Sequence, residues 1–232
     1  LLTAFANGCT AMTGVEAVSM ASLVPFGSVS EDCRVERTLG ATDVAGSQKQ
    51  RARVSTARTI ISGDYFRSLG LKVVRGREFT RDEAEGVVAR RVAVIDEPLA
   101  ERLFSARGEN PIGQYLRVAL REPGQYEEPL EIVGVVPGLR DSLFDRRPVP
   151  HLYLPFALKT RSWMNYHIRV AGGGSGAAAV LQTVRREIRA FDERLIALET
   201  GLADPDRSPA LESLVLDMVR AAADEAEAAA RD

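Results

Sequence analysis

The sequence is poor in the residue types that most often carry catalysis or bind metals. Its 232 residues include only two histidines, His151 and His167, and only two cysteines, Cys9 and Cys33. Two cysteines are too few for a structural zinc site, and they could pair with each other only in an oxidising compartment. Both histidines fall in segments with a strand pattern, so we expect structural roles for them and no histidine-based active site.

Long apolar runs and an excess of charge are also lacking. No stretch of about 18 consecutive apolar residues occurs that could span a membrane. The 30 basic and 32 acidic residues give a net charge of −2, so no strong field favours nucleic acid or an anionic membrane as a partner. The start lacks an initiator methionine and a signal-peptide pattern, so we expect the chain to be part of a longer protein.

The composition is that of a folded globular protein, with 45% hydrophobic and 27% charged residues. A short helix is expected over residues 1–12, and Gly14 ends it. A polar hairpin loop is expected over residues 40–50. It joins the second and third of three expected strands, which cover residues 15–21, 33–39 and 51–62.

Two short helices are expected in the middle of the chain. The first begins after Asp64, which is placed to cap it, and ends at Gly70. The second follows an apolar strand at residues 92–95 and begins near Asp96. The residues expected to face inward from these helices are Tyr65, Phe66, Leu69, Leu99, Leu103 and Phe104.

The remaining expected strands alternate with turns. Asn110 to Gly113 form a turn, and Gly134 suggests a β-bulge or a close approach of another backbone segment. The strands cover residues 71–74, 115–120, 130–136, 151–155, 166–170 and 195–198.

Two amphipathic helices are expected near the end of the chain. The first follows a glycine-rich turn, and the second fades into alanines and charges after residue 219. Packing of the second helix on its own domain is favoured over partner binding. The apolar residues expected to align are Val180, Leu181, Val184, Ile188 and Phe191 in the first helix, and Leu211, Leu214, Val215, Met218 and Val219 in the second.

The glycine-rich turn is the strongest candidate for chemistry. Residues 172–177 fit the pattern G-x-G-x-x-A between a strand and a helix, where backbone N–H groups can hold a pyrophosphate, and Glu199 ends the next strand. The distance to Glu199 is longer than the usual spacing, and too little chain follows to complete a nucleotide-binding fold. We therefore favour a flexible connection, with dinucleotide binding as a remote alternative.

Two further candidates are weaker still. Ser175 approaches a serine-nucleophile elbow, but Ala177 stands where the elbow needs glycine. The acidic pairs Asp82-Glu83 and Glu127-Glu128 lie in expected loops, where solvated surface charge is the usual explanation. We therefore assign no catalytic, cofactor-binding or metal-binding residue and do not expect an enzyme.

A series of short motifs follows in a fixed order along the chain. They are Ile61-Ser62-Gly63-Asp64-Tyr65-Phe66, Leu69-Gly70-Leu71, Gly76-Arg77-Glu78-Phe79-Thr80, Val92-Ala93-Val94-Ile95-Asp96, Leu103-Phe104, Asn110-Pro111-Ile112-Gly113, Glu131-Ile132-Val133-Gly134-Val135-Val136 and His151-Leu152-Tyr153-Leu154-Pro155, and a last motif covers residues 184–192. In this order the motifs resemble the MacB-like periplasmic core domain of ABC transporter permeases, a group that includes FtsX/MacB-type permeases. No single motif is diagnostic, but the order covers about four fifths of the chain. The last motif resembles the final helix of that domain in the larger permeases of the group.

This resemblance implies an α/β to α+β fold with two interleaved subdomains. A porter-like βαβ subdomain would comprise about residues 1–62 with 151–204. A mixed Sabre-like subdomain would be inserted over about residues 63–150, and residues 205–232 would form the terminal amphipathic helix. Two features depart from the family: residues 223–232 are not basic, and Gly8 stands in the expected first helix, where glycine costs about 1 kcal/mol.

The resemblance also implies a place and a role. The domain would lie on the periplasmic side of the bacterial inner membrane and couple ATP hydrolysis by a cytoplasmic ABC ATPase to substrate or partner handling. Its partners would be the membrane helices of the parent permease, a second permease copy and a periplasmic adaptor protein in some relatives. The chain itself lacks a G-x-x-x-x-G-K-[ST] phosphate loop. A free-standing extracytoplasmic binding module that kept the fold is the alternative.

Overall fold

The computed structural model divides into two compact units. The larger unit comprises Ser19–His167, and the smaller comprises Leu1–Val18 with Ile168–Asp232. The residues that the structure describes are 8–25, 31–38, 53–88, 90–104, 108–120, 125–139, 149–159, 164–171, 177, 180–186 and 188–189.

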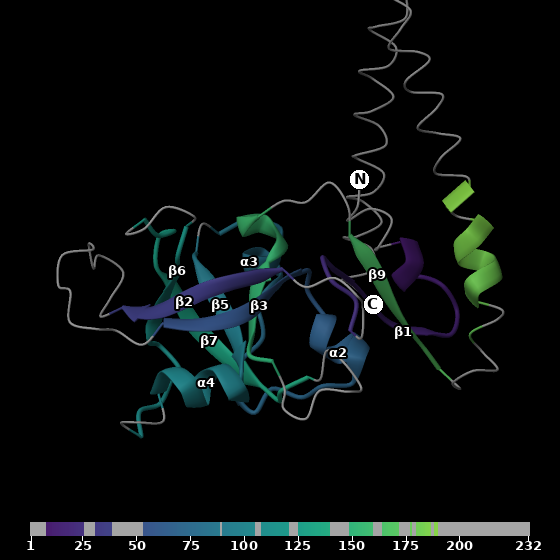
Figure 1. Ribbon diagram of the computed structural model, residues 1–232. Coiled ribbons are helices and arrows are strands. Elements are labelled where there is room, and N and C mark those ends of the chain that lie inside the picture. Colours follow the sequence, from purple (N-terminus) through teal and green to yellow (C-terminus); the bar gives the residue numbers. More distant parts are fainter. Residues whose placement is uncertain are drawn as a thin grey trace, which may run out of the picture. The chain divides into compact units, whose positions relative to one another are not determined.

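The larger unit is dominated by one sheet (Figure 1). Its strands lie in the order β2-β6-β7-β5-β8-β3-β1, and β2 also pairs with β3. The short strand β4 (Arg75–Gly76) pairs with β7 beside this path. The other strands are β1 (Val15–Ala21), β2 (Asp32–Thr38), β3 (Arg53–Ile61), β5 (Val92–Asp96), β6 (Tyr115–Val118), β7 (Leu130–Val136) and β8 (His151–Pro155).

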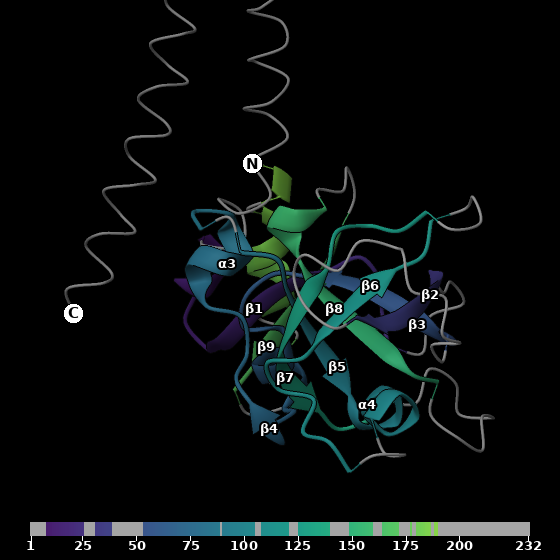
Figure 2. The same ribbon diagram turned by 90° about the vertical axis from the view of Figure 1, so that its left-hand side faces the viewer.

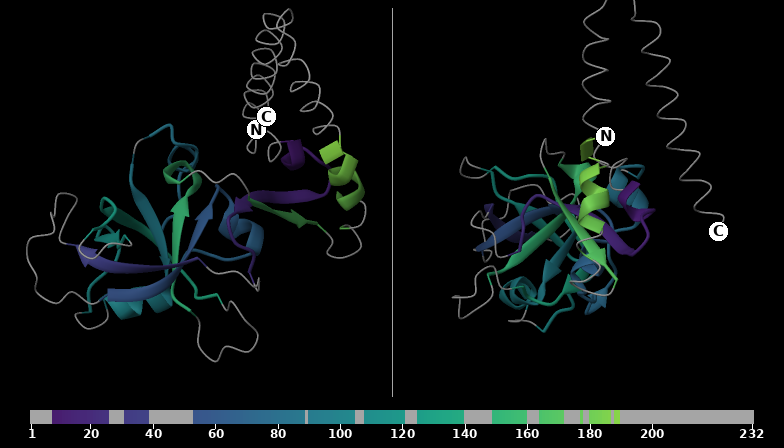
Figure 3. Two further views of the ribbon diagram at one scale, coloured as in Figure 1. Left: turned by 45° about the horizontal axis from the view of Figure 1, so that its top comes forward. Right: turned by 90° about the vertical axis from the view of Figure 1, so that its right-hand side faces the viewer.

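Six of these strands close into a ring. Val35 of β2 pairs with Val54 of β3 on one side and with Val118 of β6 on the other, both antiparallel. The ring then continues through β7, β5 and β8 back to β3. Figure 3 shows β2 and β3 side by side. Each strand of the ring pairs with a neighbour on both sides, so none of the six is an edge strand.

Alternate residues of all six strands fill the interior of the ring, as the two-residue period of strands requires. Helix α4 (Glu97–Phe104) closes one end of this interior core. Asp96 caps α4, since its Oδ1 accepts a hydrogen bond from Leu99 N–H at 2.9 Å. The buried residues of the interior core are Val35, Val54, Ala93, Ile95, Leu99, Ala100, Phe104, Leu116, Val118, Leu130, Ile132, Val135, Leu152 and Leu154.

A second core lies on the outer face of β5, β7 and β8. It is covered by α2 (Tyr65–Leu69) and by residues 71–79. The two faces of β5 divide between the cores, because Val92 and Val94 belong to the outer core while Ala93 and Ile95 belong to the inner one. This explains why residues 92–95 show no polar alternation.

Gly134 allows the segment before α3 to pack directly on β7. A Cβ on Gly134 would lie 2.1 Å from the carbonyl oxygen of Arg77, and a Cβ on Gly76 would lie 2.2 Å from that of Val133. The register of β5 against β7 also shifts here, from Ala93↔Ile132 to Val94↔Gly134, which leaves Val133 as an extra residue. Both expectations for Gly134, a bulge and a close backbone approach, are confirmed.

The ends of α2 confirm one prediction and correct another. Gly70 ends the helix with a left-handed φ of 73°, as expected. Asp64 stands at the N-cap position, but its φ of 58° is also left-handed and its side chain makes no capping hydrogen bond. The expected strand at 71–74 is wrong. The strand forms at β4 instead, where glycine permits the approach to β7.

The smaller unit contains parts of β1 and of β9 (Asn165–Val170). Gly14 has a φ of 87°, and its carbonyl accepts a hydrogen bond from Ala171 N–H at 2.8 Å. Residues 180–186 and 188–189 are helical. Of the residues expected to align on this helix, Val180 and Val184 are buried, whereas Leu181 and Ile188 are 48% and 43% exposed; Phe191 lies outside the described residues.

The described residues confirm a mixed α/β fold and most of the expected strands. Both histidines lie in strands, as predicted, and no helix among these residues is long and apolar enough to cross a membrane. The subdomain bounds inferred from the resemblance stay a prediction. The predictions for residues 40–50, 195–198 and 211–219 lie outside the described part of the chain.

Candidate functional site

A polar network lies on the outer face of β2, β3 and β6. Glu36 is the direct cross-strand partner of both Arg53 and Arg117. Arg117 Nε donates to Glu36 Oε1 at 2.8 Å, and Arg53 Nε donates to Oε2 at 3.2 Å. The hydroxyl of Tyr126 donates to the same Oε2 at 2.8 Å and accepts from Arg53 Nη2 at 2.6 Å. We call these four residues the outer-face network.

The network keeps Glu36 in its ionised form, although Glu36 is only 4% exposed. Burial by itself would raise the pKa of Glu36, but the hydrogen bonds from Arg117, Tyr126 and Arg53 outweigh it and lower that pKa. The Arg117 guanidinium also lies 3.9 Å from the centre of the Tyr126 ring, a cation–π contact. Glu36 therefore stays ionised near neutral pH and cannot serve as a proton donor. The network joins β2, β3, β6 and Tyr126 through charged hydrogen bonds.

A second network surrounds Glu83 in α3 (Arg81–Glu85). Arg77 donates to both Glu83 oxygens, at 2.6 and 2.8 Å, and Thr80 N–H donates to Oε2 at 2.9 Å. The Thr80 hydroxyl accepts from Glu83 N–H at 3.2 Å, which completes a capping box. Hydrogen bonding from Arg77 holds the pKa of Glu83 at about 2.

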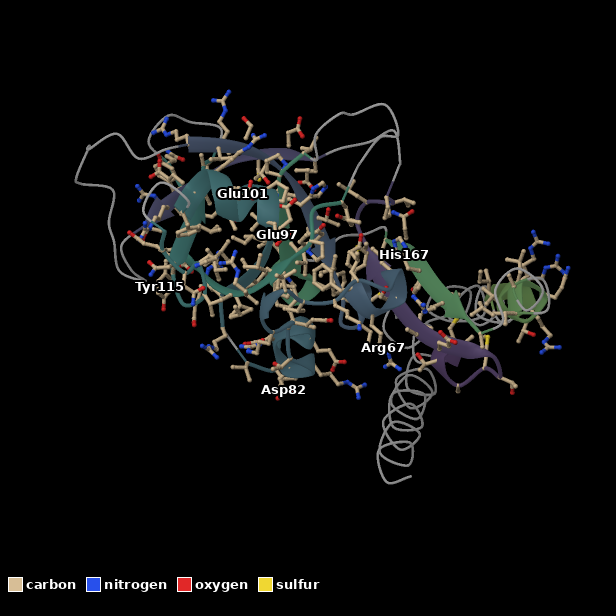
Figure 4. All side chains as sticks on the ribbon, turned by 90° about the horizontal axis from the view of Figure 1, so that it is seen from below. Arg67, Asp82, Glu97, Glu101, Tyr115 and His167 are labelled. Atoms are coloured by element: carbon tan, nitrogen blue, oxygen red, sulfur yellow. The ribbon has the colours of Figure 1, made fainter. Side chains whose placement is uncertain are left out.

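The interpretation of Asp82-Glu83 as solvated loop charge is therefore half wrong. Asp82 is exposed on α3 (Figure 4), but Glu83 is 4% exposed and holds the helix to the preceding segment. The capping-box spacing from Thr80 to Glu83 is visible in the sequence and could have shown this.

In the pair Glu127-Glu128, too, one residue is exposed and the other is packed. Glu128 is 77% exposed and pairs with Arg91 at 3.3 Å. Glu127 is 20% exposed and pairs with Lys159 at 3.1 Å and with Arg58 at 3.5 Å. Glu127 is therefore part of the packed structure rather than solvated surface charge.

The two histidines lie in buried or half-buried strand positions. His151 is 5% exposed, its Nδ1 lies 2.7 Å from the carbonyl of Val149, and its ring stacks on Tyr153. Burial lowers the pKa of His167, which is labelled in Figure 4. The His167 ring contacts the Tyr65 ring edge-to-face. For His151, the distance from Nδ1 to Asp96 Oδ2 is 3.7 Å, which is beyond hydrogen-bonding distance. These contacts are those of packed side chains.

The other candidates bring no chemistry together among the described residues. No disulfide joins Cys9 and Cys33. Within the described part of the chain, no cluster of three or more histidine, cysteine or acidic residues could hold a metal ion. Residues 172–176, with Ser175, and Glu199 lie outside that part.

Sequence reasoning missed the outer-face network. Glu36 and Arg117 are far apart in the chain and meet only because β2 pairs with β6. The available signal was the charged residue on the strand face opposite each inward valine, Val35 and Val118. That signal shows which face of each strand points away from the core, but it cannot show that Glu36 pairs with Arg117.

Comparison with known proteins identifies the family. The model of the MacB-like periplasmic core domain matches residues 11–191. A comparison with curated proteins finds no match.

Solved structures of the same kind are similar to this chain. The periplasmic region of MacB from Actinobacillus actinomycetemcomitans is 18% identical, with a TM-score of 0.54 over 82% of this chain and 73% of that one. The extracellular domain of the transporter YknZ from Gram-positive bacteria is 18% identical, with a TM-score of 0.45 over 73% and 72%. A permease domain from Porphyromonas gingivalis is 17% identical, with a TM-score of 0.45 over 76% and 72%.

The family match covers most of the chain, and its motifs correspond to described elements of the fold. Gly76 to Thr80 form the segment that packs on Gly134 and caps α3, while Val92 to Asp96 form β5 and the cap of α4. The chain belongs to the family of MacB-like periplasmic core domains of ABC transporter permeases.

Proposed function

We propose that this chain is the extracytoplasmic domain of an ABC-type export permease and acts mechanically rather than as an enzyme. The family match over residues 11–191 carries this proposal. The domain would couple ATP hydrolysis in the cytoplasm to the handling of a substrate or partner on the periplasmic side of the inner membrane.

The charged residues of the larger unit support a mechanical role. Glu36 and Glu83 each accept hydrogen bonds from arginine on both carboxylate oxygens. Carboxylates saturated in this way stiffen the elements that they join and have no proton to exchange near neutral pH. Such an arrangement suits a domain that transmits force.

The partners follow from the same proposal. They would be the membrane helices of the parent permease, a second permease copy and a cytoplasmic ABC ATPase, with a periplasmic adaptor as a further partner. The finer architecture would be a porter-like subdomain, residues 1–62 and 151–204, interrupted by a Sabre-like subdomain over residues 63–150.

The parent gene provides the first test. We expect its reading frame to encode apolar segments of about 20 residues on both sides of this chain. We also expect the full-length product to co-purify with an ABC ATPase. A reading frame without flanking apolar segments would contradict the proposal.

Reconstitution tests the coupling itself. Full-length permease with its ATPase would be compared in vesicles with a variant in which residues 11–191 are replaced by a short linker. We expect the variant to assemble with the ATPase and to lose transport. Unchanged transport by an assembled variant would show that the domain does not couple the two activities.

A further inference from the structure

The two ends of the six-stranded ring are closed in different ways. At one end, α4 inserts Leu99, Ala100 and Phe104 into the interior core. Arg37, near the carboxyl end of β2, lies over the Phe104 ring with its Cζ 5.1 Å from the ring centre. Figures 1 and 2 show α4 on one side of the strands and α3 on the opposite side, beside η2 (Phe156–Leu158).

The end opposite α4 is closed by ion pairs. Glu31, which precedes β2, pairs with Arg58 of β3, and Arg58 lies 3.5 Å from Glu127. Glu127 in turn lies 3.1 Å from Lys159, which follows η2. One chain of charges therefore joins β2, β3, the segment before β7 and the helix after β8. We call Glu31, Arg58, Glu127 and Lys159 the ionic latch.

The latch lies directly over the interior of the ring. Arg58 pairs in register with Leu152, and Cys33 pairs with Thr56, so both side chains point to the face that carries the interior core. Cys33 packs against that core, and the charges of Arg58, Glu127 and Glu31 are close enough to act on its thiol. Cys33 therefore marks the boundary between apolar core and ionic latch.

The two closures should respond differently to solvent. Withdrawing α4 would expose fully buried apolar side chains, which costs about 1.5–3 kcal/mol for each large residue. Separating a pair of partly exposed side chains, such as Glu127 and Lys159, costs only about 0.2–1 kcal/mol, and salt lowers that cost further. The pairs of Arg58 cost more to break, because Arg58 is buried at 9% exposure. The latch members Glu31, Glu127 and Lys159 are 28%, 20% and 35% exposed, so each is partly packed and partly in contact with water.

We propose that the ionic latch opens while α4 stays in place, so that the ring has one yielding end and one fixed end, and that opening increases the solvent exposure of Cys33, which is partly exposed while the latch is closed. This inference rests on the contacts of the larger unit and does not depend on the proposed function. Opening would free the segment before β7 and the helix after β8 to move relative to β2 and β3.

Thiol labelling of the 232-residue chain tests the opening. N-ethylmaleimide would be added at 50 mM and at 1 M NaCl, and mass spectrometry would follow Cys33 and Cys9 separately. Cys9 is fully buried in the smaller unit and serves as the internal control. We expect high salt to raise the labelling rate of Cys33 about two- to fivefold and to leave that of Cys9 unchanged.

Two neighbouring glutamates provide a matched pair of variants. Glu127→Gln should raise the Cys33 labelling rate at low salt and remove most of its salt dependence. Glu128→Gln alters an exposed carboxylate outside the latch and should leave both quantities as they are. Equal effects of the two variants would overturn the proposal.

Hydrogen exchange separates opening from a change in the thiol itself. Burial raises the pKa of the Cys33 thiol to about 11, and Glu127 contributes to that rise, so Glu127→Gln also changes the reactivity of the thiol. Backbone exchange has no such dependence. In Glu127→Gln and at high salt, we expect peptides over residues 125–130 and 156–159 to exchange faster, with α4 unchanged. Faster exchange in α4 as well, or no change in either peptide, would show that no separate latch exists.

Discussion

The two sides of the ring are stabilised by different physics. Strands β5, β7 and β8 bury apolar residues on both faces, one set inside the ring and the other beneath α2 and residues 71–79. Strands β2 and β6 and the start of β3 bury apolar residues only on the inner face, and their outer face carries the outer-face network with its buried Glu36 and Arg117. One sheet therefore combines a dispersion-packed side with a side held by charged hydrogen bonds.

The difference also locates the family signature. The motifs at Val92 to Asp96, Glu131 to Val136 and His151 to Pro155 form β5, β7 and β8. A strand buried on both faces tolerates few residue types at each position, because volume and polarity are both constrained. These three motifs therefore lie on the doubly buried side.

Removing a large residue from the doubly buried side should have the largest effect. Phe66 is 1% exposed and meets the Tyr153 ring edge-to-face at 5.0 Å. We expect Phe66→Ala to lower the free energy of unfolding by about 3–5 kcal/mol, measured by urea denaturation with circular dichroism. Val87→Ala, at a position that is 73% exposed, is the control and should change it by less than about 0.5 kcal/mol. Similar costs for both would refute the description of this side as tightly packed.

Adding a single methyl group at Gly134 should be nearly as costly. The new Cβ would meet the carbonyl oxygen of Arg77, which belongs to the backbone and cannot rotate away. We expect Gly134→Ala to destabilise the protein by about 3 kcal/mol. Gly63→Ala is the matched control, because its Cβ would have no neighbour within 4 Å. Equal midpoints of urea denaturation for the two variants would contradict the close approach.

The outer-face network should show a different pattern, in which a double substitution costs less than a single one. Arg117→Met leaves Glu36 ionised and buried with one strong partner fewer, and we expect a loss of about 2–3 kcal/mol. Adding Glu36→Leu removes that buried charge, so the double variant should recover part of the loss. A double-mutant cycle by urea denaturation measures the coupling. Additive losses would mean that the two residues do not interact.

The smallest effect should come from the Glu83 network and should depend on pH. The pKa of Glu83 falls from an ordinary 4.5 to about 2 in the folded chain, so its stabilisation is complete above about pH 4.5 and is lost as pH falls toward 2. We expect a contribution of about 1–2 kcal/mol, reduced by solvent because the Arg77 side chain is 40% exposed.

Unfolding at pH 5 and pH 2.5 measures this contribution. Glu83→Gln should lose less stability between the two pH values than the unaltered chain. Glu85→Gln is the control, since Glu85 pairs with Arg81 at the exposed surface, and it should keep the full pH dependence. The same pH dependence in all three proteins would show that Glu83 does not cause the loss of stability at low pH.

The sequence predicted local features well and distant ones poorly. Gly70 and Asp96 end or begin helices through backbone conformation and side chains within a few residues, so their roles are visible in the chain. Asp64 failed as a side-chain cap because its left-handed backbone replaces the extended conformation that a capping residue needs. The partners of Glu36 could not be predicted, because strand pairing across the ring decides them.

The sequence by itself determined most of the strands, the helices α2 and α4 and the family, because each depends on local conformational preference and on the order of short motifs. Only the tertiary structure decided that six strands close into a ring, that α4 closes one end of it and that ion pairs close the other. Closure joins residues distant in the chain, and their pairing is selected by the packing of the whole core rather than by any local pattern.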